Sequence, residues 1–290
     1  MLSSVPPVII ERIREVVQAN ILDFDFVGGG CINKSGRLNT SKGLLFLKWN
    51  DLKKYPGMFA AEAQGLRLLH KANVIHIPEV IHSGMADPFQ YLLLEFIEHG
   101  PRSNQYWINL GRGLARIHQQ KDDSFGLPYD NYIGSLPQYN SRSVSWINFF
   151  IQQRLEIQLK LAVDAQRMDS DFVIMFEMLY AKLPDLLTEE PPVLLHGDLW
   201  NGNIISNHAG EPCLIDPAVY FGHREVDLAM TQLFGGFDKV FLEAYANTYP
   251  LVHGFMERFD IYNLYPLLVH VNLFGGGYKS RVISIVKRYV

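Results

Sequence analysis

Apolar side chains recur every three or four residues in several separate stretches of the chain, which is the spacing of amphipathic helices. This pattern predicts helices over about residues 8–19, 58–71, 106–120, 146–161, 170–183 and 225–234. Short stretches rich in β-branched and aromatic residues, bounded by Gly, Asn and Ser, predict strands within 23–49, 74–81, 91–97 and 193–218. Most strands therefore precede most helices.

The pattern changes at Glu98-His99-Gly100-Pro101, a short segment that is typical of a hinge. We therefore expect an α+β chain with two lobes. A small, sheet-rich lobe covers residues 1–97, and a larger, mainly helical lobe covers residues 98–290.

The composition excludes several classes of protein. The chain has 290 residues, of which 48% are hydrophobic and 19% are charged, so it is neither disordered nor collagen-like. The net charge of −4 gives no broad attraction to nucleic acid or to anionic membranes, and we expect neither as a partner. The two cysteines are too few for a disulfide framework.

Neither a membrane span nor a signal peptide is predicted. No apolar run approaches the ~20 residues that cross a bilayer, and Met1 to Ile10 lacks the basic start of a signal peptide. We therefore expect a cytoplasmic protein. The basic, amphipathic stretch 278–288 is compatible with a membrane-surface helix, but the pattern favours a terminal helix that packs its Val and Ile side chains on the larger lobe.

The most informative segment is His196-Gly197-Asp198-Leu199-Trp200-Asn201-Gly202-Asn203, which follows a short apolar strand. It carries a carboxylate and, five residues later, a carboxamide. Two further apolar runs, Ile204-Ile205 and Leu214-Ile215, flank a turn and predict a hairpin centred near Ala209-Gly210. This register would set Asn203 opposite Asp216.

Carboxylate and carboxamide oxygens at the open end of a hairpin suit Mg²⁺, which takes one or two protein oxygens together with water and phosphate. Asp198 would then remain to act on a hydroxyl. The alternative is that Asp198 and Asn203 only close turns and that Asp216 caps a helix. Three such residues in one short region favour the chemical interpretation.

In these residues the chain resembles the fructosamine (ketosamine) kinase family, within the aminoglycoside phosphotransferase and protein-kinase-like fold. The similarity extends over nearly the whole chain. Its motifs are Gly-Gly-Gly-Cys-Ile-Asn at 28–33, Phe-Leu-Lys at 46–48, Leu-Leu-His-Gly-Asp-Leu-Trp at 194–200, Asp-Pro-Ala at 216–218, Gly-His-Arg-Glu-Val-Asp-Leu-Ala-Met at 222–230 and Leu-Phe-Gly-Gly at 273–276. Together these motifs are specific, whereas the glycine run alone is not.

Lys48 interrupts an apolar strand, and Glu62 lies on the apolar stripe of the helix predicted at 58–71. A buried carboxylate needs a cation, and the resemblance implies that Lys48 is this cation and faces the nucleotide phosphates. The alternatives are an edge-strand lysine and a surface Glu62.

The resemblance also implies the remaining nucleotide contacts. Gly28, Gly29 and Gly30 would cover the phosphates of ATP, although the spacing differs from the protein-kinase glycine loop and an ordinary hairpin turn is the alternative. The backbone of Glu95, Phe96 and Ile97 would bind adenine. Cys31 lies in the glycine turn, where oxidation could block nucleotide binding if its thiol is exposed, whereas a buried structural cysteine is equally compatible.

Other residues are expected around the reacting groups. Asp227 is implied to be a structural carboxylate that accepts hydrogen bonds from the catalytic-loop backbone, and His196 is interpreted as a core histidine. On the acceptor side, the resemblance points to Trp200, His270 and Asn272, although Trp200 could equally pack in the core.

We therefore expect an ATP- and Mg²⁺-dependent small-molecule kinase with Asp198 as the catalytic residue and Asn203 and Asp216 as metal ligands. The resemblance implies that the acceptor is a ketosamine, free or protein-bound, phosphorylated at the 3-hydroxyl of its sugar, with a role in deglycation. The alternatives are a kinase for another alcohol, such as an aminoglycoside or choline, and a nucleotide-binding regulator without turnover. The sequence does not indicate an oligomeric state.

Overall fold

The computed structural model describes residues 2–27 and 33–290. These residues form two compact units. The first runs to Tyr106 and also includes Ile205–Asp216, whereas the second consists of Trp107–Ile204 and Pro217–Val290. The boundary between the two lobes, expected after residue 97, stays a prediction.

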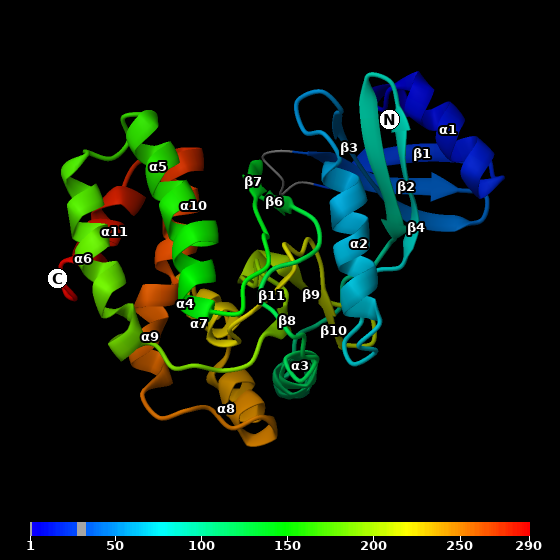
Figure 1. Cartoon of the computed structure of the whole chain (residues 1–290). Helices are drawn as coiled ribbons and strands as arrows, with labels where there is room; N and C mark the ends of the chain where they lie inside the picture. The colour runs from blue at the N-terminus through cyan, green and yellow to red at the C-terminus, as the bar shows by residue number, and fades with distance from the viewer. Residues whose placement is uncertain (1, 28–32) are drawn as a thin grey trace. The chain divides into compact units, whose positions relative to one another are not determined.

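The first unit is built around an antiparallel sheet of five strands in the order β1-β2-β3-β5-β4 (Figure 1). The strands are β1 (Ile21–Phe26), β2 (Lys34–Thr40), β3 (Gly43–Asp51), β4 (Val80–Ala86) and β5 (Phe89–Glu95). The two helices are α1 (Pro7–Val17) and α2 (Met58–His70), and a short 3₁₀ turn (Leu2–Ser4) precedes them. Because β3 pairs with both β2 and β5, its register is set from both sides.

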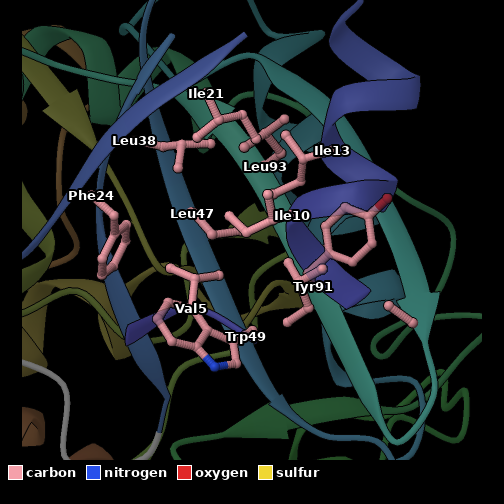
Figure 2. Close-up of a cluster of buried hydrophobic side chains, with 12 residues drawn as sticks. Val5, Ile10, Ile13, Ile21, Phe24, Leu38, Leu47, Trp49, Tyr91 and Leu93 are labelled. Carbon is pink, nitrogen blue, oxygen red and sulfur yellow. The ribbon is translucent and has the colours of Figure 1, made fainter. Parts of the chain in front are cut away.

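A cluster of buried apolar side chains joins α1 to one face of the sheet (Figure 2). Its members include Ile9, Ile10, Ile13, Phe24, Leu38, Leu47, Trp49 and Leu93. Each such side chain contributes about 1.5–3 kcal/mol when it is fully buried. Because Leu47 and Trp49 point into this cluster, the pleat of β3 turns the intervening Lys48 toward the opposite face.

Helix α2 buries Phe59, Leu66 and Leu69 and lies close to β4 and β5. Its apolar positions follow the three- and four-residue spacing that predicted it. Glu62 lies on the same stripe, so the fold brings a carboxylate to the inner side of the helix.

The strand expected within residues 74–81 is wrong in position, since β4 begins only at Val80. Asn73 has a left-handed backbone with φ of 52°, and Pro78 has no backbone N–H to donate to a strand ladder. His76 instead forms an isolated bridge with Cys213.

Residues 205–216 belong with the first unit because they form a hairpin against the segment that follows β5. This hairpin consists of β9 (Ile204–Ser206) and β10 (Pro212–Leu214), as the apolar runs predicted. The N–H of Gly100 donates to the carbonyl of Ser206 at 2.9 Å, and the Ser206 hydroxyl donates to the carbonyl of Pro101 at 2.7 Å.

The second unit is mainly helical. Its helices are α3 (Asn104–Ile117, which begins in the first unit), α4 (Trp146–Phe149), α5 (Glu156–Asp164), α6 (Asp171–Leu186), α7 (Glu225–Leu233), α8 (Lys239–Thr248), α9 (Phe255–Tyr262), α10 (Leu264–Phe274) and α11 (Tyr278–Val286). Two short strand pairs, β6 (Asn131–Ile133) with β7 (Leu136–Gln138) and β8 (Val193–Leu195) with β11 (Tyr220–Gly222), lie among them. The sequence did not indicate the pair β6–β7.

The helix expected over 146–161 is interrupted by a π-helical segment, Phe150–Leu155. This segment carries the fully buried Arg154, whose guanidinium donates to Asn140 Oδ1 at 2.7 Å and lies 4.0 Å from the ring centroid of Tyr220.

The C-terminal helix α11 buries Val282, Ile285 and Val286 and contacts α6, α9 and α10. The prediction that it packs on the larger unit is therefore confirmed. Among the described residues, no helix combines the length and the apolar character that a bilayer span requires.

Candidate active site

Two carboxylates share a buried lysine in the first unit. Lys48 Nζ lies 2.8 Å from Glu62 Oε1 and 3.1 Å from Asp216 Oδ1. The exposed fraction of the side chain is 6% for Lys48 and 11% for Glu62, but 44% for Asp216. The ion pair expected between Lys48 and Glu62 is therefore present, and Asp216 is a second partner that the sequence did not indicate.

The charges in this cluster depend on one another. Burial opposes the charge of Lys48, but the carboxylates of Asp216 and Glu62 outweigh burial and raise the pKa of the ammonium group. For Glu62, burial raises the pKa of the carboxyl group, and Lys48 opposes that shift. Lys48 therefore stays protonated, and its charge is available at the partly exposed Asp216 side of the cluster.

Asp216 lies in a backbone conformation that side chains seldom adopt. Its φ is 53°, in the left-handed region, and it lies between the end of β10 and Pro217. Residues held in this region cost roughly 1–3 kcal/mol and persist only where the surrounding structure enforces them. The bend aims the carboxylate at Lys48 instead of continuing the strand.

The hairpin register differs from the expected one. The N–H of Asn207 donates to the carbonyl of Glu211 at 2.9 Å, which centres the turn on Ala209. Asn203 lies in a 3₁₀ turn (Asn201–Asn203), and Asp216 lies beyond β10. Strand register alone therefore does not pair Asn203 with Asp216. These residues belong to different units, and their joint role at a metal stays a prediction.

A cavity of about 370 Å³ lies beside the segment that follows β5. It is lined by Leu44, His76, Glu95, Phe96, Ile97, Glu98, Asn207 and His208. The Glu95 carboxylate is held by His76 Nε2 at 2.9 Å and by the N–H of Glu79 at 3.2 Å. Because β5 ends at Glu95, the next residues leave the hydrogen-bond ladder of the sheet beside the cavity. The three residues predicted to bind adenine therefore share one pocket.

In the second unit, a buried carboxylate anchors the backbone of the loop 196–203. Asp227 on α7 accepts from the N–H of His196 at 2.7 Å and from that of Gly197 at 2.9 Å. Burial opposes its charge, but hydrogen bonding to His118 and nearby positive charge outweigh burial and lower the pKa of Asp227. The carboxylate is therefore ionised and supports the loop in the way the resemblance implies.

Gly197 allows the loop to turn. Its φ is 81°, and a Cβ at this position would lie 2.0 Å from the carbonyl oxygen of Ala218. The N–H of Ala218 in turn donates to the carbonyl of His196 at 2.9 Å. A side chain at position 197 would separate the loop from its neighbouring segment.

Asp198 and Asn203 contact each other across the loop. Asn203 Nδ2 lies 2.8 Å from both the backbone carbonyl and Oδ2 of Asp198. Because Nδ2 of Asn203 donates to these two atoms of Asp198, the amide oxygen of Asn203 is the atom that can coordinate a cation. His196 is fully buried, and its Nδ1 accepts from the N–H of Asp198 at 3.3 Å.

His118 is a site residue that sequence reasoning missed. Its Nε2 lies 3.2 Å from Asp227 Oδ2, and its Nδ1 lies 2.8 Å from the hydroxyl of Tyr245. It follows the last turn of α3 and is far from Asp227 in sequence, so no local pattern marked it. A buried histidine between a carboxylate and a phenol holds Asp227 in place.

The residues predicted on the acceptor side separate into two environments. Trp200 is 39% exposed, and its ring contacts Phe234. His270 lies among aromatic rings on α10. Asn272 instead binds α5, since its Nδ2 donates to the backbone carbonyl and to Oε1 of Gln158 at 2.8 and 2.9 Å.

The predictions for Gly28, Gly29, Gly30 and Cys31 lie outside the described residues. The other cysteine, Cys213, is buried and unbridged. Burial raises the pKa of its thiol, so it is an inert core residue.

The chain is similar to known proteins over nearly its whole length. Residues 7–290 match the family model described as fructosamine kinase. A "probable ketoamine kinase" of Synechocystis sp. is 39% identical over 263 residues, covering 90% of this chain and 88% of the relative. A chloroplastic protein-ribulosamine 3-kinase of Arabidopsis thaliana is 41% identical over 270 residues, covering 91% of this chain and 81% of the relative.

Solved structures confirm the fold. The crystal structure of a "putative fructosamine-3-kinase" from Thermobifida fusca has a TM-score of 0.88 at 32% identity and covers 96% of this chain and 97% of its own. The aminoglycoside phosphotransferase APH(4)-Ia has a TM-score of 0.64 at 15% identity over 98% of this chain and 99% of its own, which is a likeness of fold alone. The expected α+β, protein-kinase-like fold is therefore confirmed.

Proposed function

This chain belongs to the fructosamine kinase family, and we propose that it transfers the γ-phosphoryl group of ATP to the 3-hydroxyl of a ketosamine sugar. The acceptor is a 1-amino-1-deoxyketose derived from fructose or ribulose, free or attached to a protein amine. The observation that carries this proposal is the family match over residues 7–290. Removal of such phosphorylated sugars from proteins gives the reaction a role in deglycation.

In the proposed reaction, Asp198 accepts the proton of the sugar hydroxyl while the hydroxyl oxygen forms a bond to the γ-phosphorus. The bond between that phosphorus and the bridging oxygen of ADP breaks, and ADP leaves with the electron pair. Asn203 holds the Asp198 side chain at 2.8 Å, which supports a fixed direction for proton acceptance. Positioning and charge neutralisation account for most of the catalysis in phosphoryl transfer.

Lys48 supplies positive charge to the phosphates, and Glu62 keeps it in position. The difference in exposure between the two carboxylates supports this division of roles. Glu62 is nearly buried, whereas Asp216 is 44% exposed at its side chain. Glu62 is therefore the permanent partner of Lys48, and Asp216 is the carboxylate that can bind a metal cation.

The donor atoms of Asn203 and Asp216 fit Mg²⁺. A carboxylate and a carboxamide oxygen are hard donors of the kind that this ion prefers. When bound, Mg²⁺ would neutralise charge on the β- and γ-phosphates. We propose the cavity beside Glu95, Phe96 and Ile97 as the adenine site, since its volume of about 370 Å³ accommodates a purine.

The test is ADP release with a panel of acceptors under matched ATP and Mg²⁺. Fructose- and ribulose-derived ketosamines, free and on lysine, are expected to give far higher kcat/KM than kanamycin, choline or homoserine. ¹³C and ³¹P NMR of the product would identify the phosphorylated oxygen. A competing alcohol as the better acceptor would leave the kinase fold intact and overturn the ketosamine assignment.

A further inference from the structure

Five buried polar side chains of the second unit form one continuous hydrogen-bond network. They come from β6, β7, the residues just after β7, the π-helical segment and α10, and they are Asn131, Gln138, Asn140, Arg154 and Tyr265. None of the five is exposed by more than 5%. With so little accessible surface, none of them is placed to bind ATP or the acceptor, so a role in the reaction must act through a neighbouring residue.

Gln138 is the branch point of this network. Its Nε2 donates to the carbonyl of Ala218 at 3.0 Å and to Asn131 Oδ1 at 2.8 Å. Its Oε1 accepts from the hydroxyl of Tyr265 at 2.7 Å. Because a peptide carbonyl can only accept, the orientation of the Gln138 carboxamide is fixed, and both of its ends are satisfied.

The rest of the network runs from Arg154 to a second backbone carbonyl. The Arg154 guanidinium donates to Asn140 Oδ1 at 2.7 Å, and Asn140 Nδ2 donates to Asn131 Oδ1 at 2.9 Å. Asn131 Nδ2 in turn donates to the carbonyl of Val219 at 2.9 Å. Hydrogen bonds in such a chain polarise and strengthen one another, and the positive charge of Arg154 lies at its start. The network therefore holds two consecutive carbonyls, those of Ala218 and Val219.

Ala218 lies directly against the catalytic loop. Its N–H donates to the carbonyl of His196 at 2.9 Å, and its carbonyl oxygen would lie 2.0 Å from a Cβ on Gly197. The oxygen that Gln138 holds is therefore the same atom that packs against position 197, one residue before Asp198. A shift of the Ala218 peptide would be passed to the loop at once, because the two segments are in contact.

Tyr265 also brings the network close to the proposed proton acceptor. Burial raises the pKa of the Tyr265 phenol, the guanidinium of Arg154 opposes that shift, and the negative charge of Asp198 adds to it. The phenol therefore stays protonated and keeps its hydrogen for Gln138.

We propose that Gln138 is a positioning residue for phosphoryl transfer, which fixes the Ala218 peptide against the catalytic loop and so sets the direction of the Asp198 carboxylate. The proposal rests on the proposed function, in which Asp198 accepts the hydroxyl proton. A misplacement of about 1 Å in such a site can cost about 10²-fold in rate. Stability alone does not require these polar groups, since an apolar core of the same shape can be equally stable.

The first variant is Gln138→Met, which keeps the length of the side chain but removes its donors and its acceptor. With the best acceptor of the panel described above, kcat should fall by at least about tenfold, while KM for ATP stays nearly unchanged. The value of kcat is expressed per ATP-binding site counted by calorimetric titration, so misfolded protein does not lower it. A role in stability alone would reduce the number of sites and leave kcat per site unchanged.

The second variant is Tyr265→Phe, which keeps the ring and removes only the hydroxyl that donates to Gln138. It should lower kcat per site about fivefold, the equivalent of one neutral hydrogen bond. The matched control is Tyr180→Phe on α6, because within the part of the chain that the structure describes the buried hydroxyl of Tyr180 has no hydrogen-bond partner. The control should leave kcat per site unchanged. This pair keeps the test intact if Gln138→Met does not fold.

The same two changes are then made together with Asp198→Asn. If Gln138 acts through Asp198, Gln138→Met and Tyr265→Phe should lower kcat little further once the carboxylate is gone. An equal loss with and without Asp198, or an unchanged kcat per site in both single variants, would overturn the positioning role while the kinase assignment stands. Near-native turnover of Asp198→Asn alone would instead overturn the role of Asp198 in the proposed function, and the positioning role with it.

Discussion

Lys48 on β3 and Glu62 on α2 form a buried ion pair, with Nζ 2.8 Å from Oε1. Neither side chain is exposed by more than 11%. Removing one partner of a buried pair leaves the other charge without compensation and costs about 3–5 kcal/mol in fully buried cases. Asp216 remains beside Lys48 when Glu62 is lost, which moderates the cost on that side.

We therefore expect Lys48→Met and Glu62→Gln to be strongly non-additive. Each single change removes the same ion pair, so the double variant should lose little more than the worse single variant. The coupling free energy is expected to be about 1–3 kcal/mol, measured in a double-mutant cycle on kcat/KM and on urea unfolding.

The exposed pair Lys160 and Asp164 is the control for this cycle. Its side chains are 74% and 58% exposed, and such surface pairs contribute about 0.3–0.5 kcal/mol. Lys160→Met and Asp164→Asn should therefore combine almost additively. Zero coupling between Lys48 and Glu62 would contradict the pairing as a functional unit.

Asp198→Asn tests the assignment of the proton acceptor. Asparagine keeps the size of the side chain but cannot accept the hydroxyl proton in the same way. Turnover should fall by at least ~10², the scale of lost general-base assistance, while the affinity for Mg·ATP changes little. Steady-state kinetics and calorimetric titration measure the two quantities, and near-native turnover would remove Asp198 from its proposed role.

Gly197→Ala should destabilise the second unit by more than about 2 kcal/mol. The new Cβ would lie 2.0 Å from the Ala218 carbonyl oxygen, and the φ of 81° adds strain. Gly235→Ala is the matched control, because its φ is 72° and its Cβ would meet no atom within 4 Å. The control should cost about 1–2 kcal/mol, the strain of a Cβ in the left-handed region, in thermal or urea unfolding. Equal losses for the two variants would refute the close-approach argument.

His223 should make the stability of the protein depend on pH. The side chain is fully buried, and burial, reinforced by Arg224 and Arg258, lowers its pKa to about 4, compared with about 6.5 in an unfolded chain. Between these values only the unfolded state binds the proton. The free energy of unfolding should therefore fall by about 3 kcal/mol from pH 7 to pH 4 on account of this residue.

The measurement is urea unfolding at several pH values for the wild type and for His223→Phe, which keeps a ring beside Tyr262. The carboxylates titrate in both proteins, so the difference between the two curves isolates the histidine. The variant should show the flatter dependence between pH 6.5 and 4 whatever its absolute stability. Parallel curves would show that His223 takes up its proton in the folded state as well.

The sequence by itself determined the helices and strands that depend on the spacing of nearby residues. Helical spacing at 58–71 and a turn between apolar runs at 204–215 place α2 and the hairpin close to where they occur. It also indicated that Glu62 needs a cation, because a carboxylate on an apolar stripe is costly unless it is paired. The family motifs identified Asp198, Asn203 and Asp227 as candidates for the reaction and its support.

The tertiary structure alone decided which distant side chains meet. Asp216 joins Lys48 across 168 positions, and His118 joins Asp227 across 109. Periodicity shows which side of an element is buried, but packing of whole elements selects the partner, and the partners found here lie too far apart in sequence for any local pattern to specify them.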